Sequence, residues 1–85
     1  MHRDLKLPNL LLTKEQRIKV CDFGVARHVS ASHGGPSDSY DPTFCVGTRD
    51  WMAPEVILCQ SYGLPADVFS FGECGLFRAL LTTFI

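Results

Sequence analysis

The sequence has no excess of charge of either sign, because eight lysines and arginines are balanced by nine acidic residues and the formal net charge is −1. Without a basic stripe or a polybasic cluster, the composition does not indicate binding to nucleic acid or to an anionic membrane surface. Hydrophobic residues make up 46% of the chain, which is more than disordered chains have. The length of 85 residues therefore predicts one small folded unit that can bury only a small hydrophobic core.

Long apolar runs are also missing. Charged residues stand close to the N-terminus, and the run "NLLL" at positions 9–12 is too short for a signal peptide. The apolar C-terminal stretch is interrupted by Glu73 and Arg78, and it falls short of the roughly 20 residues that span a bilayer. We expect no membrane span in this segment.

The four cysteines include no C-x-x-C pair, so the sequence does not indicate a zinc site. They are Cys21, Cys45, Cys59 and Cys74. Four cysteines are enough for a disulfide framework, but nothing in the sequence indicates secretion. We therefore predict reduced thiols and a cytoplasmic or nuclear protein, and membrane attachment through other regions stays open.

Short structural elements can be placed from local patterns. The β-prone runs at 10–13 and 18–22 are separated by four polar residues, which predicts a hairpin. The stretch "SASHGGPSDSYDP" at 30–42 predicts a long surface loop. A short helix is expected over 53–60, where Pro54 and Glu55 suit a first turn. Residues 65–83 predict a second helix, apolar nearly all round, which is typical of a buried helix.

Four polar residues near the N-terminus carry the groups that phosphoryl transfer needs. A carboxylate must orient the attacking hydroxyl, a cation must neutralise phosphate oxygens, and hard oxygen ligands must hold Mg²⁺. Because a hairpin returns its second strand beside the first, Asp22 is expected next to Asn9, with Lys6 and Asp4 on the same loop. The pattern indicates a phosphate-handling site.

Four motifs carry a family resemblance. "HRDLKLPN" at 2–9, "DFG" at 22–24, "APE" at 53–55 and "DVFSFG" at 67–72 occur in the order of the eukaryotic protein kinase catalytic domain, which the chain resembles over about residues 1–72. The segment "GTRDWMAPEVI" at 47–57 is similar to the corresponding segment in the tyrosine-kinase-like group of Ser/Thr kinases. The resemblance implies an α+β fold, part of the C-terminal lobe of a kinase, without the N-terminal lobe. Residues 1–85 would be a partial domain with a catalytic loop at 2–9, an activation segment at 22–55 and a buried helix at about 65–83.

The resemblance assigns roles to matching positions. Asp4 resembles the catalytic base, Lys6 the phosphate-contacting lysine, and Thr48 the threonine that bonds both. Asn9 and Asp22 match the two Mg²⁺ ligands. ATP and Mg²⁺ are the implied cofactors, and a protein that carries Ser or Thr is the implied substrate.

Further positions follow from the same resemblance. Leu11 lies on the strand that would support the adenine, and Leu10, Leu11 and Leu12 are expected in the core, as is Phe23. Asp67 would hold the backbone of the catalytic loop.

The regulatory positions also come from the resemblance. Arg3 would bind a phosphate on the activation segment, and Phe23 would stack on His2. We predict that Ser39 or Thr43 is the phosphorylated residue.

The predicted function is transfer of the γ-phosphate of Mg-ATP to Ser or Thr hydroxyls of proteins. The glycine-rich loop and the V-A-I-K-type lysine of the family have no counterpart here. We therefore expect the chain to start within a domain and the 85 residues alone to be inactive. Two alternatives stay open: a non-catalytic fragment that acts as a binding decoy through the docking loop (residues 48–54), or a gene-model error after Gly72, where Gly75 and two charges depart from the family helix.

Overall fold

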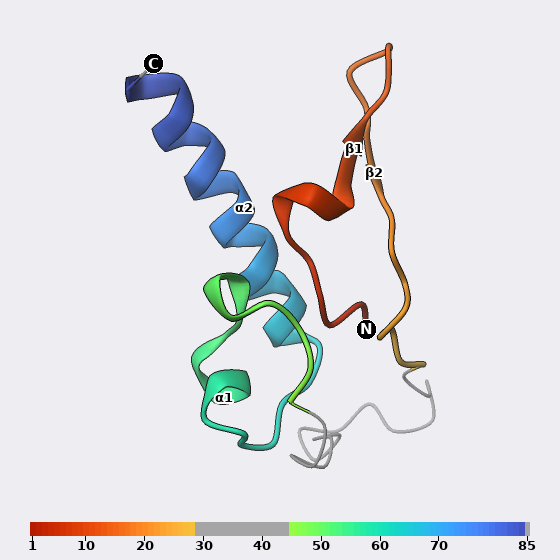
Figure 1. The fold of residues 1–85 in the computed structure, drawn as a ribbon, viewed down its shortest axis with the longest axis vertical. Coiled ribbons are helices and arrows are strands. Elements are labelled where there is room, and N and C mark those ends of the chain that lie inside the picture. Colours follow the sequence, from red (N-terminus) through yellow and green to blue (C-terminus); the bar gives the residue numbers. More distant parts are fainter. Residues whose placement is uncertain (29–44, 85) are drawn as a thin grey trace.

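The computed structural model describes residues 1–28 and 45–84. The described part is α+β: a two-stranded sheet stands beside one long helix, with one short helical turn leading into the sheet and two more beside the lower part of the helix (Figure 1). In chain order the elements are η1 (Leu7–Asn9), β1 (Leu10–Leu12), β2 (Ile18–Val20), η2 (Arg49–Trp51), α1 (Pro54–Ile57) and α2 (Pro65–Phe84).

The predicted hairpin is confirmed. Strands β1 and β2 pair antiparallel, with Leu10 opposite Val20 and Leu12 opposite Ile18. The turn is closed by Thr13, whose N–H donates to the carbonyl of Arg17 at 2.8 Å. Both strands are shorter than the predicted runs at 10–13 and 18–22, because Thr13 belongs to the turn and the chain leaves the sheet after β2.

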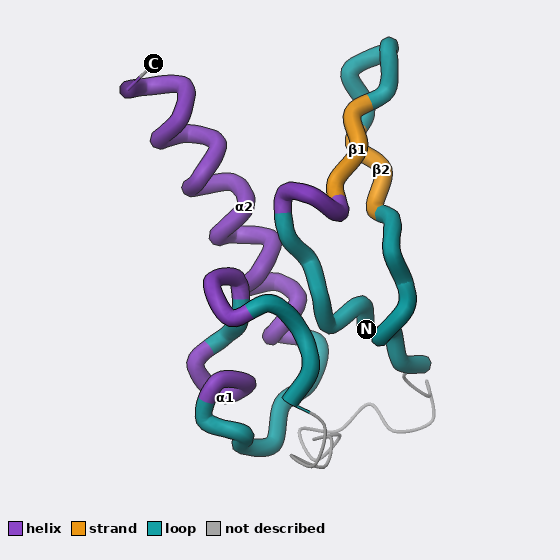
Figure 2. The backbone as a smooth tube through the Cα atoms, in the orientation of Figure 1, coloured by secondary structure: helices purple, strands orange, loops and turns teal. Residues whose placement is uncertain are grey.

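Below the hairpin, the N-terminal segment and residues 21–27 run side by side (Figure 2). The N–H of Cys21 donates to the carbonyl of Asn9 at 2.9 Å. Met1 and Arg27 exchange two hydrogen bonds, since the terminal ammonium donates to the carbonyl of Arg27 at 2.9 Å and the N–H of Arg27 donates back at 2.8 Å. Two segments that are distant in sequence are thereby held together.

Both predicted helices form, each beginning with a proline in its first turn. Proline suits this position because its missing N–H would have no partner within the helix. Helix α1 ends at Ile57, earlier than the predicted 60, and Cys59 just beyond it has a φ of 52°. Helix α2 covers Pro65–Phe84, in agreement with the prediction over 65–83.

A small core lies where α1 and the start of α2 meet. Its buried members are Ala53, Val56, Tyr62 and Ala66. Met1 and Met52 pack against them, which ties the N-terminus to the two helices. A separate buried residue is Cys74, farther along α2.

The prediction that α2 is buried is wrong within the described residues. Val68 is 72% exposed, and several other large apolar side chains of the helix are exposed as well. The described neighbours cover only part of the helix. Trp51 of η2 packs against Phe77 with the rings tilted and their centroids 5.4 Å apart, and the Trp51 carbonyl accepts a hydrogen bond from Ser70. The helix has the apolar surface of a buried helix without enough described partners to cover it.

The expectation that Leu10, Leu11, Leu12 and Phe23 lie in the core is also wrong within the described residues. Leu11 and Leu12 are exposed and Leu10 is half-buried, while Phe23 is 63% exposed. A two-stranded sheet has two faces and two open edges, and the described residues leave most of that surface uncovered. Within the described ranges, no helix is both long and apolar enough to cross a membrane.

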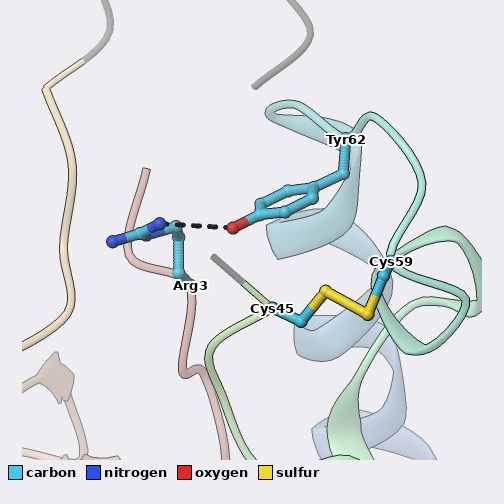
Figure 3. Close-up of a disulfide and its surroundings, with 4 residues drawn as sticks. All are labelled: Arg3, Cys45, Cys59 and Tyr62. Carbon is cyan, nitrogen blue, oxygen red and sulfur yellow. Dashed lines mark hydrogen bonds between the residues drawn. A yellow bond between two sulfur atoms is a disulfide. The ribbon is translucent and has the colours of Figure 1, made fainter. Parts of the chain in front are cut away.

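The prediction of reduced thiols is wrong for two of the four cysteines. Cys45 and Cys59 form a disulfide, with Cα atoms 5.7 Å apart (Figure 3). Their separation of 14 residues gave no sign of this contact, because the chain has to turn through η2 and α1 to bring them together. Cys21 and Cys74 are free, as predicted.

Replacement of Gly47 by alanine is expected to destabilise the fold by about 1–3 kcal/mol. Gly47 has a φ of 128°, and a Cβ atom there would lie 2.7 Å from the carbonyl oxygen of Arg3. Urea denaturation of the 85-residue chain measures the change.

The matched control is Gly75→Ala. A Cβ at Gly75 meets no described atom within 4 Å, and alanine is favoured over glycine in a helix by about 1 kcal/mol. This variant should be equally or more stable than the parent. Equal stabilities of the two variants would contradict the close approach at Gly47.

Candidate active site

The site is anchored by a carboxylate of α2. Asp67 accepts two backbone hydrogen bonds from the N-terminal segment, from the N–H of His2 at 2.7 Å and from that of Arg3 at 2.9 Å. Arg3 has a φ of 71°, a left-handed conformation that a non-glycine residue adopts only when its surroundings hold it there. Asp67 thus takes the position that the family resemblance implied for it, holding the backbone of His2 and Arg3.

His2 is buried and connects this segment to the end of the hairpin. Its Nδ1 accepts from the N–H of Asp4 at 3.1 Å, so its Nε2 carries the proton and donates to the carbonyl of Cys21 at 2.9 Å. Phe23 meets the His2 ring edge-on, with centroids 5.1 Å apart. The predicted His2–Phe23 stack therefore forms, although Phe23 is mostly exposed.

Asp4, Thr48 and Lys6 form the polar centre of the site, here called the Asp4–Thr48–Lys6 cluster. The Thr48 hydroxyl donates to Oδ1 of Asp4 at 2.8 Å and accepts from Nζ of Lys6 at 2.8 Å. The Lys6 ammonium also lies 3.6 Å from Oδ2 of Asp4. The side chains of Lys6 and Asp4 are 24% and 17% exposed, so both are sheltered yet reachable from solvent.

Asn9 lies beside this cluster at the base of the hairpin. Its side-chain amide donates to the carbonyl of Asp4 at 2.9 Å, so its amide oxygen is the group left for a ligand. The hydrogen bond between Cys21 and the carbonyl of Asn9 brings the residue before Asp22 to the same place. The two sequence-predicted metal-binding positions are therefore neighbours across the hairpin.

Asp22 is exposed, and Oδ1 of its carboxylate accepts a 3.3 Å hydrogen bond from the N–H of Gly24. One carboxylate and one amide oxygen suit Mg²⁺, which binds proteins through few oxygen ligands and keeps waters or substrate phosphates for the rest. In residues 1–28 and 45–84, no three His, Cys, Asp or Glu side chains are grouped to hold a metal. The donor set fits a metal that arrives with its own oxygen ligands.

Leu11, the position predicted beneath an adenine, is on the exposed hairpin. It lines a groove between the hairpin and α2, together with Leu7, Leu10, Leu12, Ile18, Phe71, Cys74, Gly75 and Arg78. The groove is apolar except for Arg78. The described residues thus place Leu11 on an open apolar surface and do not enclose it.

Arg3, the predicted phosphate ligand, uses its side chain within the described structure. Its Nε donates to the carbonyl of Val25 at 2.7 Å and its Nη1 to the hydroxyl of Tyr62 at 3.2 Å (Figure 3). A guanidinium has five N–H donors, so these bonds orient it and occupy two of them. The predicted phosphorylation positions, Ser39 and Thr43, lie outside the described residues.

Sequence reasoning missed Tyr62, Gly47 and the disulfide. Tyr62 is 3% exposed and aims its hydroxyl at Arg3 across 59 residues of sequence. An isolated tyrosine before a helix carries no local signal of such a contact. Gly47 was within a quoted motif, and its place directly before Thr48 was the signal that could have indicated a close backbone approach.

The fold and this geometry agree with the comparison against known families. The family profile described as "Protein kinase domain" matches residues 1–84. The chain belongs to the protein kinase domain family.

Curated relatives point the same way. A "Probable serine/threonine-protein kinase" from Dictyostelium discoideum is 50% identical over 72 residues, which are 85% of this chain and 11% of the relative. The "Serine/threonine-protein kinase PLK4" of Drosophila yakuba is 44% identical over 81 residues, 95% of this chain and 10% of the relative. The chain spans about a tenth of the length of these proteins. Their names do not mention the tyrosine-kinase-like group, which stays a prediction.

Replacement of Asp67 should separate the N-terminal segment from α2. Asp67→Ala leaves two partly buried N–H groups without their carboxylate, at a cost of about 2–4 kcal/mol, because hydrogen bonds to charged groups contribute about 1.5–3 kcal/mol each. Urea denaturation of the 85-residue chain measures the loss.

Asp67→Asn is the matched variant, since one oxygen acceptor is kept and the volume is unchanged. We expect it to lose roughly half as much stability as Asp67→Ala. A loss for Asp67→Ala no larger than that for Asp67→Asn would argue against the double acceptor role.

Proposed function

We propose that this chain is the catalytic part of a serine/threonine protein kinase and supplies the groups that orient the substrate hydroxyl and the phosphate. The observation that carries the proposal is the Asp4–Thr48–Lys6 cluster, in which a carboxylate, a hydroxyl and an ammonium share hydrogen bonds beside Asn9. Family membership over residues 1–84 and relatives named as serine/threonine kinases support the same activity.

We further propose that the 85 residues belong to the C-terminal lobe of the kinase fold. This placement is supported by the order of the elements, with a catalytic loop and hairpin first and the long helix α2 last. The exposed apolar side chains of α2 and of the hairpin would then be covered by other parts of the domain. The same placement explains why a sequence typical of a buried helix has a mostly exposed surface here.

Asp4 is the proposed general base. Its Oδ1 accepts from Thr48 and its Oδ2 lies 3.6 Å from Lys6, so the carboxylate is held in one orientation by two partners. A carboxylate in this position can accept a hydrogen bond from a Ser or Thr hydroxyl and hold its oxygen ready for attack. The chemistry depends mainly on this positioning.

Lys6 would bring positive charge to the transferred phosphoryl group. Its ammonium is already oriented by the Thr48 hydroxyl, so little further ordering is needed when a phosphate arrives. Because the ammonium has three donors, the bond to Thr48 leaves it able to contact a phosphate oxygen.

ATP and Mg²⁺ are the proposed cofactors, and protein kinases use both in general. Asn9 and Asp22 would hold the metal, and Leu11 would lie under the adenine. Mg²⁺, when bound, neutralises the charge on the phosphate oxygens. The exposed carboxylate of Asp22 and the restrained amide of Asn9 suit this role, since one residue is accessible and the other is fixed in orientation.

The regulatory roles remain proposals of the same kind. Arg3 would bind a phosphate on Ser39 or Thr43, and Tyr62 would keep the Arg3 guanidinium pointed toward it. The edge-on contact of Phe23 with His2 would form in the active conformation of the site, because His2 also accepts a hydrogen bond from the backbone N–H of Asp4. We place the protein in the cytoplasm or nucleus, as the sequence predicted.

Asp4→Asn should reduce kcat for phosphorylation of a Ser/Thr peptide by about 10³-fold, since a positioned base contributes about 10²–10⁴-fold. The KM for ATP should change little, because Asp4 is not assigned to nucleotide binding. The measurement is transfer of labelled γ-phosphate by the full-length protein.

The control for Asp4→Asn is Glu15→Gln, which removes one carboxylate from the exposed hairpin turn. It should retain the parent kcat. A fully active Asp4→Asn enzyme would overturn the assignment of the base.

Thr48→Val should lower kcat/KM by about 10- to 100-fold. Valine has the shape of threonine but no hydroxyl, so Asp4 loses a donor and Lys6 loses an acceptor, and both groups are less firmly positioned for the reaction. Steady-state kinetics with peptide and ATP measure the change.

Thr48→Ser is the matched control, because it keeps the hydroxyl and removes only a methyl group. Its activity should stay within a few-fold of the parent. Equal losses for the Ser and Val variants would show that packing, and not the hydroxyl, matters at this position.

A further inference from the structure

The disulfide between Cys45 and Cys59 encloses the segment that carries Thr48. Between the two cysteines lie Thr48, η2 and α1, so the bond ties the start of the Thr48 segment to the turn that follows α1. Figure 3 shows the bridge close to the Arg3–Tyr62 hydrogen bond. None of the roles proposed above makes use of the disulfide.

The enclosed segment is joined to the rest of the site at few points. Val46 lines a small cavity with Met1 and Arg3, and Gly47 approaches the Arg3 carbonyl so closely that a Cβ atom would lie 2.7 Å from it. Thr48 then reaches Asp4 and Lys6. The position of the Thr48 hydroxyl therefore depends on how firmly residues 46–48 are held against Arg3.

A covalent link at Cys45 restricts this segment directly, because Cys45 is only three positions before Thr48. Closing a loop with a disulfide reduces the number of conformations open to the chain in between. On its other side, α1 anchors the segment through the buried residues Ala53 and Val56. With the bond reduced, the start of the segment loses its covalent restraint. Among the described contacts, the two Thr48 hydrogen bonds then hold that end, while the core contacts and the Trp51 contacts with α2 hold the other.

We propose that Cys45 and Cys59 form a thiol–disulfide exchange site, open to a thiol reductant such as glutathione, whose oxidised state holds Thr48 on Asp4 and Lys6. Cys59 is exposed and follows the short helix α1, whereas Cys45 is half-buried. Cys59, the more exposed residue of the pair, is therefore the proposed point of attack. In a reducing compartment, which the sequence predicts, disulfides are usually transient and take part in redox sensing.

The exchange balances with two molecules of thiol. A thiolate attacks Sγ of Cys59, the bond to Cys45 breaks, and Cys45 leaves as a thiolate that takes up a proton. A second thiolate then attacks the reductant's sulfur in the mixed disulfide, which releases Cys59 as a thiol and leaves the reductant as its own disulfide. Two electrons and two protons reach the protein, and oxidation by glutathione disulfide reverses both steps.

The other two cysteines provide an internal reference. Cys74 is buried, and desolvation raises the pKa of its thiol, which keeps it protonated and a poor nucleophile. Cys21 is half-buried, and its thiol contacts the Asn9 carbonyl at 3.4 Å. We expect both to stay thiols under conditions in which Cys45 and Cys59 are joined.

The first test uses the full-length protein equilibrated in glutathione buffers of increasing oxidised fraction. Free thiols are blocked, the protein is digested without reduction, and peptides are identified by mass spectrometry. A peptide pair linked through Cys45 and Cys59 is expected to rise with the oxidised fraction, while Cys21 and Cys74 carry the blocking group throughout. Absence of the linked pair even in excess glutathione disulfide would overturn the proposal.

The second test measures amide hydrogen exchange of the oxidised and reduced protein. Exchange across residues 46–52 is expected to be about tenfold faster after reduction, because the segment opens more often, whereas the hairpin amides at 10–20 should not change. The double variant Cys45→Ser/Cys59→Ser should exchange like the reduced protein with or without dithiothreitol. Equal exchange rates in the two redox states would show that the disulfide does not restrain residues 46–52.

The proposal rests on the proposed kinase function only for its effect on catalysis. Reduction is expected to lower kcat/KM for peptide phosphorylation several-fold, and the double serine variant should lose this redox dependence. If both forms lack activity while linkage and exchange behave as stated, the kinase assignment fails and the exchange site stands. If both forms are equally active, the proposed effect on Thr48 is wrong.

Discussion

The carboxylate of Asp67 is the interaction on which the rest of the site depends. It holds two consecutive backbone N–H groups that lie 65 and 64 residues away in sequence. A charged acceptor with two short hydrogen bonds is among the stronger polar interactions in a protein of this size. Because Arg3 is held in a left-handed conformation by these bonds, the chain turns there, and Asp4 is directed toward Thr48.

The polar network compensates for a small apolar core. The four residues of that core are alanine, valine and tyrosine, and no large side chain in the described residues is fully buried. Asp67, His2 and Asn9 instead connect the N-terminal segment, the hairpin and α2 through backbone groups. Hydrogen bonds are directional, so such a network determines geometry more narrowly than apolar contact does. The proposed phosphoryl transfer, in which positioning would supply most of the effect, would benefit from that property.

The parts of the fold that the sequence predicted are those with a local physical cause. The hairpin follows from two β-prone runs around a polar turn, and the starts of α1 and α2 follow from Pro54 and Pro65. The contact of Thr48 with Asp4 and Lys6 was predicted only through family resemblance, because 42 to 44 residues separate the loop from Thr48. The disulfide and the contact of Tyr62 with Arg3 could not be predicted, since neither residue spacing nor composition indicates which residues distant in sequence come into contact.

Burial was the property that sequence predicted least well, and the reason is physical. An apolar pattern indicates that a surface needs a partner, but it does not say whether that partner lies in the same 85 residues. Helix α2 shows the difference, because Cys74 is buried against the hairpin side while Val68 is exposed. The chain spans about a tenth of the length of its relatives, and under the proposed placement in a larger kinase domain other parts would cover this apolar surface. The Asp67 network and the Asp4–Thr48–Lys6 cluster, in contrast, form between residues of the chain itself.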